Sequence, residues 1–412
     1  MKKIFIADFL PLANKGEEEI IRGIETLYKC KINDDVEFRV FGDVENIVQV
    51  DNVVVYPRSI CYPLEPNCSG KKRIVCDIWM AIKGFLGVYP YKSNMEKNPN
   101  LMRDLRDSDK VLIGHDGFFN IRCSLLGLFL AKNGIKYSIL GAGFNRPSKK
   151  IAWIYDKVYK KCFDKADYIV LREKTAYKYV KEISSNSNVY LLPDPAFFCP
   201  SDKYRKEWIA KMVSKYRLNE DGLKIGITIC ENSISFSTAF KNSMQKKKSH
   251  RDFITDILRY VYDKTKCKFY FLPHCIEEGA GNDLVIARDI VSRLGNDVSC
   301  EIIEEDMPVL DIKHIISRMD MMIGERTHSI INSISTSTPF LSLTCSADFR
   351  THDIVGKGCG LEDYVYDMDY PDATFVENKV MCIIGNLAKE RVRLDSVCVK
   401  NESYKEKFIQ II

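Results

Sequence analysis

Two side chains that could hold an anion and move a proton lie at a strand-to-helix turn late in the chain. Arg326 and His328 follow an apolar run, 319–323, that ends at Gly324. Apolar residues at helical spacing come next, and Pro339 then leads into a second apolar run. This order predicts a βαβ unit, in which ligands bind at the carboxyl ends of the strands. An arginine fork suits carboxylate or phosphate, and histidine exchanges protons near neutral pH.

An Arg-x-His pair also has an ordinary interpretation, a surface arginine beside a capping or core histidine. The expected position at a helix N-terminus, where free N–H groups favour an anion, makes the functional interpretation the better one.

The segment resembles the signature of the polysaccharide pyruvyl transferases. There, a strand ending in aspartate and glycine leads to Arg-x-His, a helix of small residues, a proline and an apolar strand. Stretches similar to other family motifs occur in the family's order, at 14–20, 109–117, 171–175, 193–196 and 272–274. The resemblance covers most of residues 1–370.

The resemblance implies transfer of pyruvate from phosphoenolpyruvate to two hydroxyls of one sugar, with formation of a cyclic ketal and release of phosphate. Such a reaction requires cations for the donor's carboxylate and phosphate, an acid for its methylene and a base for the hydroxyls. Arg326 is expected to hold the donor, and His328, as imidazolium, to be the acid. Phosphoenolpyruvate is then a co-substrate, and no cofactor is expected.

Further donor-binding residues are expected at Ser329, Arg172, His274 and Arg350. Arg172 and His274 follow apolar runs and match family motifs, although a salt bridge and a structural histidine would explain them equally well. Arg350 stands where many relatives carry lysine after a tyrosine motif, but Ala347 replaces that tyrosine.

The base and the acceptor site are expected among Asn14, Glu17 and Asp116. Glu17 lies near a predicted helix start, where a carboxylate is also favoured by the helix dipole. Asp116, with His115, replaces glycines that are usual at that turn of the family.

No metal site is expected. Asp306, Asp311 and His314 are near one another in sequence but have no recognised ligand spacing. The 15 cysteines are odd in number and include no Cys-x-x-Cys, which argues against a zinc ribbon.

Composition indicates a globular protein, with 46% hydrophobic and 28% charged residues. A net charge of +5 does not require nucleic acid as a partner. The chain enters directly on an apolar strand with no predicted signal peptide, and no apolar run is long enough to span a bilayer. We therefore expect a cytoplasmic protein, either free or at the inner face of the membrane, acting on a sugar acceptor that is free or lipid-linked.

Short apolar runs alternate with amphipathic ones, a pattern typical of parallel sheets covered by helices. The length of 412 residues suggests two domains. We predict an N-terminal Rossmann-like domain at 1–200 on the acceptor side, and a C-terminal Rossmann-like domain at 201–379 with the donor site. We also predict a helical tail at 380–412, whose last helix can cross back to the N-terminal domain. Two such domains facing a cleft, the GT-B-like arrangement, are what the resemblance implies.

Residues 59–100 interrupt the alternation and are interpreted as an insertion over the sheet. Within them, the aromatic run 79–91 contains Gly84, Gly87 and Pro90, which argues against a long core helix. This run is expected either to be a buried flap, to dock at a membrane surface or to stack on acceptor sugars.

Other functions remain open at this stage. A GT-B glycosyltransferase using a nucleotide sugar shares the two-domain form, although its usual Glu-x(7)-Glu spacing is not found. A non-catalytic binding protein on the same fold would not require both Arg326 and His328. An NAD-binding protein is disfavoured because no Gly-x-Gly-x-x-Gly follows the first strand.

Overall fold

A computed structural model describes most of the chain, and its ranges are 1–9, 14–32, 35–42, 44–50, 52–61, 71–91, 95, 97–114, 119–144, 152–231, 243–276, 282–346 and 348–412. The chain divides into two compact units. Unit 1 comprises 1–12, 24–195 and 404–412, and unit 2 comprises 13–23 and 196–403. The predicted functional boundaries at 200 and 379 stay a prediction, because the units are defined by compactness alone.

Unit 1 is built on an eight-stranded sheet in the order β3-β4-β2-β1-β5-β6-β7-β8. Neighbouring strands are parallel except for the antiparallel pair β3–β4. The strands are β1 (Lys2–Phe9), β2 (Val36–Gly42), β3 (Val48–Val50), β4 (Val53–Pro57), β5 (Lys110–Ile113), β6 (Ser138–Ala142), β7 (Ile169–Leu171) and β8 (Val189–Leu191).

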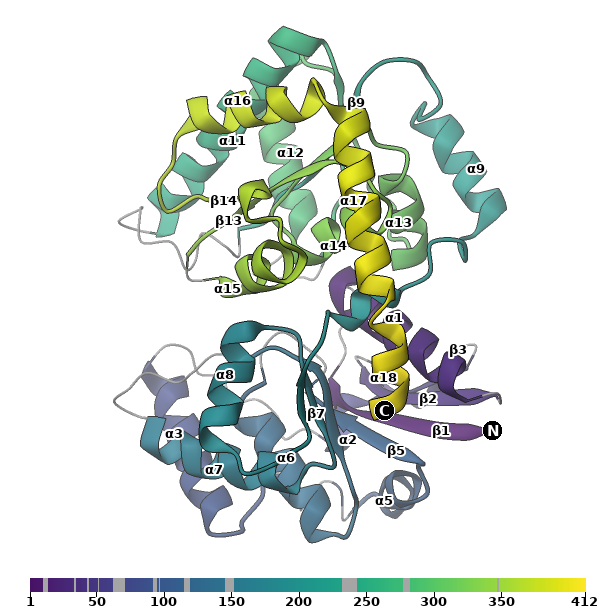
Figure 1. Ribbon diagram of the computed structural model, residues 1–412, viewed down its shortest axis with the longest axis vertical. Coiled ribbons are helices and arrows are strands. Elements are labelled where there is room, and N and C mark those ends of the chain that lie inside the picture. The colour runs from purple at the N-terminus through teal and green to yellow at the C-terminus, as the bar shows by residue number, and fades with distance from the viewer. Residues whose placement is uncertain are drawn as a thin grey trace. The chain divides into compact units, whose positions relative to one another are not determined.

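The helices that accompany this sheet are α1 (Lys15–Lys31), α2 (Arg58–Cys61), α3 (Lys71–Phe85), α5 (Pro99–Arg106), α6 (Ile121–Lys132), α7 (Ala152–Lys165) and α8 (Lys174–Ile183) (Figure 1). Helix α1 is divided between the units after Gly23. Helices α3, α6 and α7 pack on one another. They share an apolar core with the strands, formed by side chains such as Phe5, Ile113 and Phe163.

Unit 2 is built on a six-stranded parallel sheet in the order β11-β10-β9-β12-β13-β14. Its strands are β9 (Lys224–Thr228), β10 (Lys268–Phe271), β11 (Cys300–Ile302), β12 (Met321–Gly324), β13 (Phe340–Thr344) and β14 (Val365–Asp367). The chain order reverses at β9, which has β10 on one side and β12 on the other. Ligands of such sheets bind at the carboxyl ends of the strands beside this reversal.

Helices cover this second sheet and continue into the C-terminal tail (Figure 1). They are η1 (Pro195–Phe198), α9 (Lys206–Lys215), α11 (Ser243–Thr265), α12 (Asp283–Leu294), α13 (Val309–Ile316), α14 (Thr327–Ser335), α15 (Phe349–Thr351), η2 (His352–Gly358), η3 (Glu362–Tyr364), α16 (Ala373–Ile384) and α17 (Leu387–Glu402). The last helix, α18 (Lys405–Ile411), belongs to unit 1. Segment η2 is a π-helix, which is rare and often marks a functional region.

The predicted fold class, two Rossmann-like α/β units, is confirmed. The expected strand–helix–strand unit around Arg326 appears as β12, α14 and β13. Whether the units face a cleft stays a prediction.

The aromatic run is not one long helix, because α3 ends at Phe85, before Gly87 and Pro90, but the expectation that Gly84 interrupts it was wrong. Helix α3 extends through Trp79 to Phe85 with Gly84 inside it. A Cβ at Gly84 would lie 1.9 Å from Leu125 Cδ2, so the glycine allows α3 to approach α6 closely. The residue serves packing between helices and does not end the helix.

Gly127 provides a test of packing in unit 1. Its Cβ would lie 2.8 Å from Ile113, 2.9 Å from Cys162 and 2.9 Å from Tyr137. We expect Gly127→Ala to lower the free energy of unfolding by about 1–3 kcal/mol, despite alanine's better helix propensity. Urea unfolding followed by circular dichroism measures this change.

Gly356→Ala is the matched control, since its added Cβ would meet no atom closer than 3.5 Å. It should change the free energy of unfolding by less than about 1 kcal/mol. Equal stability of the two variants would contradict the tight packing at Gly127.

Candidate active site at the strand ends of unit 2

The turn between β12 and α14 is fixed by hydroxyl groups. The Ser329 hydroxyl donates to the Arg326 carbonyl at 2.7 Å and pairs with the Thr228 hydroxyl at 2.6 Å. Gly324 is required because a Cβ there would lie 2.6 Å from Thr228 Oγ1. Ser329 is completely buried. Its observed contacts therefore hold the turn, and its role in donor binding stays a prediction.

The guanidinium of Arg326 is oriented by a carboxylate that the sequence did not single out. Arg326 Nη2 donates to Asp283 Oδ1 at 2.6 Å, and Nε donates to Oδ2 at 3.2 Å. Asp283 is buried at the first turn of α12 and also accepts the backbone N–H groups of His274 and Cys275, each at 3.0 Å. Burial raises the pKa of Asp283, and the charge of Arg326 opposes that shift. This carboxylate links the ends of β10 and β12.

His328 lies against the start of helix α1. A Cβ at Gly16 would be only 2.4 Å from His328 Nδ1 and 2.8 Å from its Cγ. Only glycine leaves room for the imidazole in this position. The residues that resembled two separate family motifs, 14–20 and 326–328, are therefore brought together within unit 2.

The first turn of α1 is tied to the end of β10. Asn14 forms a β-bridge with Cys275, and the Lys15 N–H donates to the His274 carbonyl at 2.9 Å. The Asn14 side chain accepts from the Gly16 N–H at 3.2 Å and donates to Glu17 Oε1 at 3.0 Å. Glu17 is thus a buried carboxylate in the first helical turn, the alternative that the sequence left open. Its action as a base stays a prediction.

His274 is a neutral acceptor in this arrangement. Its Nδ1 donates to the Leu272 carbonyl at 3.1 Å, which fixes the tautomer. Burial lowers the pKa of His274 to about 4, and the charges of Arg326 and Lys15 add to this effect. Nε2 is buried and has no hydrogen-bond partner among the described residues. This atom therefore presents a lone pair to an incoming donor, and it cannot serve as a cation for an anion.

A histidine–carboxylate pair lies beside Arg326 and was missed by the sequence analysis. His250 Nε2, from α11, contacts Glu325 Oε1, while Glu325 Oε2 accepts from the Cys230 N–H at 2.8 Å. Both side chains are buried. The glutamate immediately before the Arg-x-His segment was the available signal, but its partner lies 75 residues earlier. The pair joins the turn that bears Arg326 to the end of β9.

The remaining predicted residues are not brought to this cluster by any described contact. Arg172, in unit 1, pairs with Asp194 at 2.6 Å and lies 3.6 Å from Glu173. Arg350 pairs with Asp348 at 2.6 Å. Asp116 and its neighbour His115 lie outside the described residues.

The acidic residues considered for a metal have separate partners. Asp306 pairs with Lys15 and Asp311 pairs with Arg205, each at 2.6 Å, while His314 stacks on Tyr204. Within the ranges that the structure describes, no group of three potential ligands is found. The cysteines in these ranges are free thiols.

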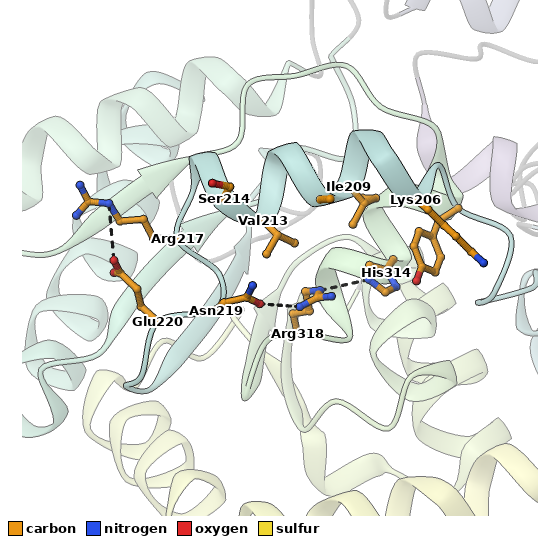
Figure 2. A pocket seen from close by; sticks show the side chains of 11 residues that line it. Lys206, Ile209, Val213, Ser214, Arg217, Asn219, Glu220, His314 and Arg318 are labelled. Carbon is orange, nitrogen blue, oxygen red and sulfur yellow. Dashed lines mark hydrogen bonds and ion pairs between the residues drawn. The ribbon is translucent and has the colours of Figure 1, made fainter.

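A separate pocket of about 550 Å³ opens between α9 and the α13 region of unit 2 (Figure 2). Ile209 and Val213 of α9 form one wall, and His314 and Arg318 lie opposite. Arg318 Nε donates to His314 Nε2 at 3.2 Å. None of the predicted site residues lines this pocket, so His314 offers a control position for work on the candidate site.

The two α/β units with their parallel sheets define a GT-B-like fold class. Solved structures similar to the chain include S. aureus MnaA in a co-structure with UDP (14% identity, 100% of this chain and 98% of that chain, TM-score 0.56). A UDP-GlcNAc 2-epimerase from Neisseria meningitidis bound to UDP-GlcNAc is similar (12%, 96% and 94%, 0.57), as is the trehalose-6-phosphate synthase OtsA (11%, 100% and 98%, 0.58). At these identities the likeness shows the fold.

The chain belongs to the polysaccharide pyruvyl transferase family, whose model matches residues 51–346. The family resemblance that the sequence suggested is thereby confirmed. The match includes Arg326, His328 and His274, and it indicates a transferase of polysaccharide synthesis. No curated protein sequence matches the chain.

The neutral state of His274 predicts a pH-dependent stability. Its folded pKa of about 4 is below the unfolded value of about 6.5, so only the unfolded chain binds this proton between those values. Stability from this group is complete above the unfolded pKa and is lost as pH falls towards 4, by about 3 kcal/mol.

We expect the free energy of unfolding of the wild type to fall more steeply than that of His274→Gln as pH decreases from 7 to 4.5, the glutamine having no proton to bind. Urea titrations at a series of pH values give both curves. Parallel curves would show that His274 is not held neutral in the folded protein.

Proposed function

We propose that this protein transfers pyruvate from phosphoenolpyruvate to two hydroxyls of a sugar, forming a cyclic ketal and releasing phosphate. The observation that carries the proposal is the meeting of Arg326, His328 and His274 with the first turn of α1 in unit 2. A cation, a titratable imidazole and a neutral acceptor are the three kinds of group that the reaction requires. The sugar would belong to a polysaccharide or to its lipid-linked precursor.

Arg326 would bind the donor's carboxylate or phosphate. Asp283 occupies part of its guanidinium and fixes its direction. A guanidinium has five N–H donors, and the pairing with Asp283 uses two of them. Arg326 is also the N-cap of α14, and its side chain makes no capping hydrogen bond. The N–H groups of the first turn of α14 would add to the attraction for an anion.

His328 would protonate the methylene carbon of the donor. This step converts the methylene to a methyl group and leaves the central carbon electrophilic. His328 must then be imidazolium, and a bound donor phosphate would favour that form by its negative charge. The contact with Gly16 limits the positions that the ring can adopt.

His274 would receive the hydroxyl proton, a role different from the donor binding expected from the sequence. Its unprotonated Nε2 can accept a hydrogen bond from a hydroxyl, whereas its only N–H already donates to the Leu272 carbonyl. A pKa of about 4 makes it a weak base in the free protein. A bound donor dianion beside Arg326 and Lys15 would offset their charges and strengthen the base.

With two histidines, the protons taken up and released in the reaction balance. The first sugar hydroxyl attacks the central carbon, and its proton goes to His274 and then to the departing phosphate. The second hydroxyl displaces the phosphate, and its proton restores the imidazolium of His328. One proton thus ends on the new methyl group and one on the phosphate.

The direct test incubates the protein with phosphoenolpyruvate and a panel of free and lipid-linked glycosides. Phosphate release with a matching mass gain of a pyruvate ketal on the sugar supports the proposal. Release of nucleotide from a nucleotide sugar, with no phosphate released from phosphoenolpyruvate, would favour a glycosyltransferase. Ligand binding with no product of either kind would favour a non-catalytic binding protein.

His328→Gln should lower turnover by roughly a hundredfold or more, the usual scale of lost acid catalysis, while phosphoenolpyruvate binding stays within a few-fold. Steady-state kinetics and calorimetry measure the two effects. His314→Gln, in the separate pocket, is the matched control and should behave as wild type. Unchanged turnover in His328→Gln would rule out this histidine as the acid.

Arg326→Lys should show the opposite pattern. A lysine cannot reproduce the two-point pairing with Asp283, so the charge loses its fixed direction. We expect calorimetry to show roughly tenfold or greater weakening of phosphoenolpyruvate binding, a loss of about 1.4 kcal/mol, with acceptor binding unchanged. An unchanged donor affinity would exclude Arg326 from the donor site.

A further inference from the structure

Helix α3 presents an unusual row of apolar side chains to solvent. Val75, Trp79, Ile82 and Leu86 are 65%, 57%, 39% and 71% exposed. Their spacing places them on one face of the helix, which continues to Leu86 through its N–H bond to the Ile82 carbonyl. The opposite face is buried at Ala81. The exposed row therefore does not contribute to the core of unit 1.

Helix α7 extends this surface. Trp153 is 63% exposed, and Phe85 at the end of α3 is 47% exposed. Lys161 Nζ lies 3.9 Å from the centre of the Phe85 ring, and Lys157 Nζ lies 5.7 Å from that of Trp153. These contacts, and the packing of α3 against α7 in Figure 1, make one continuous surface. We call it the α3–α7 surface, formed by Val75, Trp79, Ile82, Phe85, Leu86, Val88 and Trp153 with the neighbouring lysines.

The charges around the α3–α7 surface are predominantly positive. Lys83 lies over Trp79, and Lys157, Lys160 and Lys161 are exposed on α7. The exposed acidic group on α7, Asp164, is paired with Lys160 at 2.9 Å. An apolar face with tryptophans and a lysine border is the composition of helices that lie in the interface of a membrane.

We propose that the α3–α7 surface docks on a bilayer that contains anionic lipid. The aromatic and aliphatic side chains would enter the boundary between headgroups and acyl chains, and the lysines would contact the phosphates. A second copy of the chain fits less well, because a symmetric contact would bring the two lysine groups together and like charges would oppose it. Docking would be peripheral, since no helix within the described ranges is both long and apolar enough to cross a bilayer.

Co-sedimentation of the full chain with vesicles tests this proposal. Wild-type protein should bind phosphatidylcholine vesicles that contain phosphatidylglycerol, and more weakly bind phosphatidylcholine alone. Trp79→Gln with Leu86→Gln should weaken partitioning by at least roughly tenfold, because two exposed apolar side chains are lost. Lys157→Gln with Lys161→Gln should weaken binding to the anionic vesicles by roughly twenty-five-fold, taking about fivefold for each lysine.

Val392→Gln with Val399→Gln is the matched control, since both valines are exposed and lie on α17, which is not part of the α3–α7 surface. It should bind vesicles as wild type does. Tryptophan fluorescence gives a second measurement on the unaltered protein, because two of its three tryptophans lie on the surface. A blue shift and quenching by brominated lipid are expected.

Absence of wild-type binding to either vesicle, or equal binding of the Trp79 and Leu86 variant after circular dichroism shows it folded, would overturn the proposal. Loss of dimers by that variant in sedimentation equilibrium, without vesicle binding by wild type, would show that a second copy covers the surface. Vesicle binding requires no substrate, so this result is independent of the pyruvyl transfer reaction.

Discussion

The candidate site depends on a single buried carboxylate. Asp283 receives the guanidinium of Arg326 and the N–H groups of His274 and Cys275. A carboxylate and a guanidinium removed from water are stable only when they pair and their hydrogen bonds are satisfied, and removal of one partner typically costs about 3–5 kcal/mol. The same requirement that protects the fold therefore fixes the direction of Arg326 and the position of the loop after β10.

The strand order of the second sheet explains how buried carboxylates can hold the site together. Strands β10 and β12 flank β9, so their carboxyl ends open at one edge. His274 follows β10, Arg326 and His328 follow β12, and Cys230 follows β9. The His250–Glu325 pair ties the β9 end to the Arg326 turn, while Asp283 ties the β10 end to it. Two local clamps thus hold groups from three strands in place.

The two histidines of the site, His274 and His328, have different surroundings. Burial and the nearby positive charges lower the pKa of His274 and keep it neutral, while donation of its only N–H to the Leu272 carbonyl fixes the tautomer. His328 is only partly buried and stands at a helix N-terminus against Gly16. Under the proposed reaction, one ring must accept a proton and the other donate one, and different surroundings are how a protein assigns such roles to identical side chains. The α3–α7 surface belongs to unit 1 and shares no residue with this chemistry.

The sequence by itself determined the alternating α/β pattern, the strand–helix–strand unit around Arg326 and His328, and the family, because hydrophobic periodicity and short motifs are local signals. The tertiary structure decided which groups meet: Asp283 with Arg326, Gly16 with His328, and His250 with Glu325. It also decided that His274 is a neutral acceptor and that Trp79 is exposed, whereas the sequence left a buried flap open. These outcomes depend on partners and neighbours far along the chain, and on burial, which periodicity does not encode.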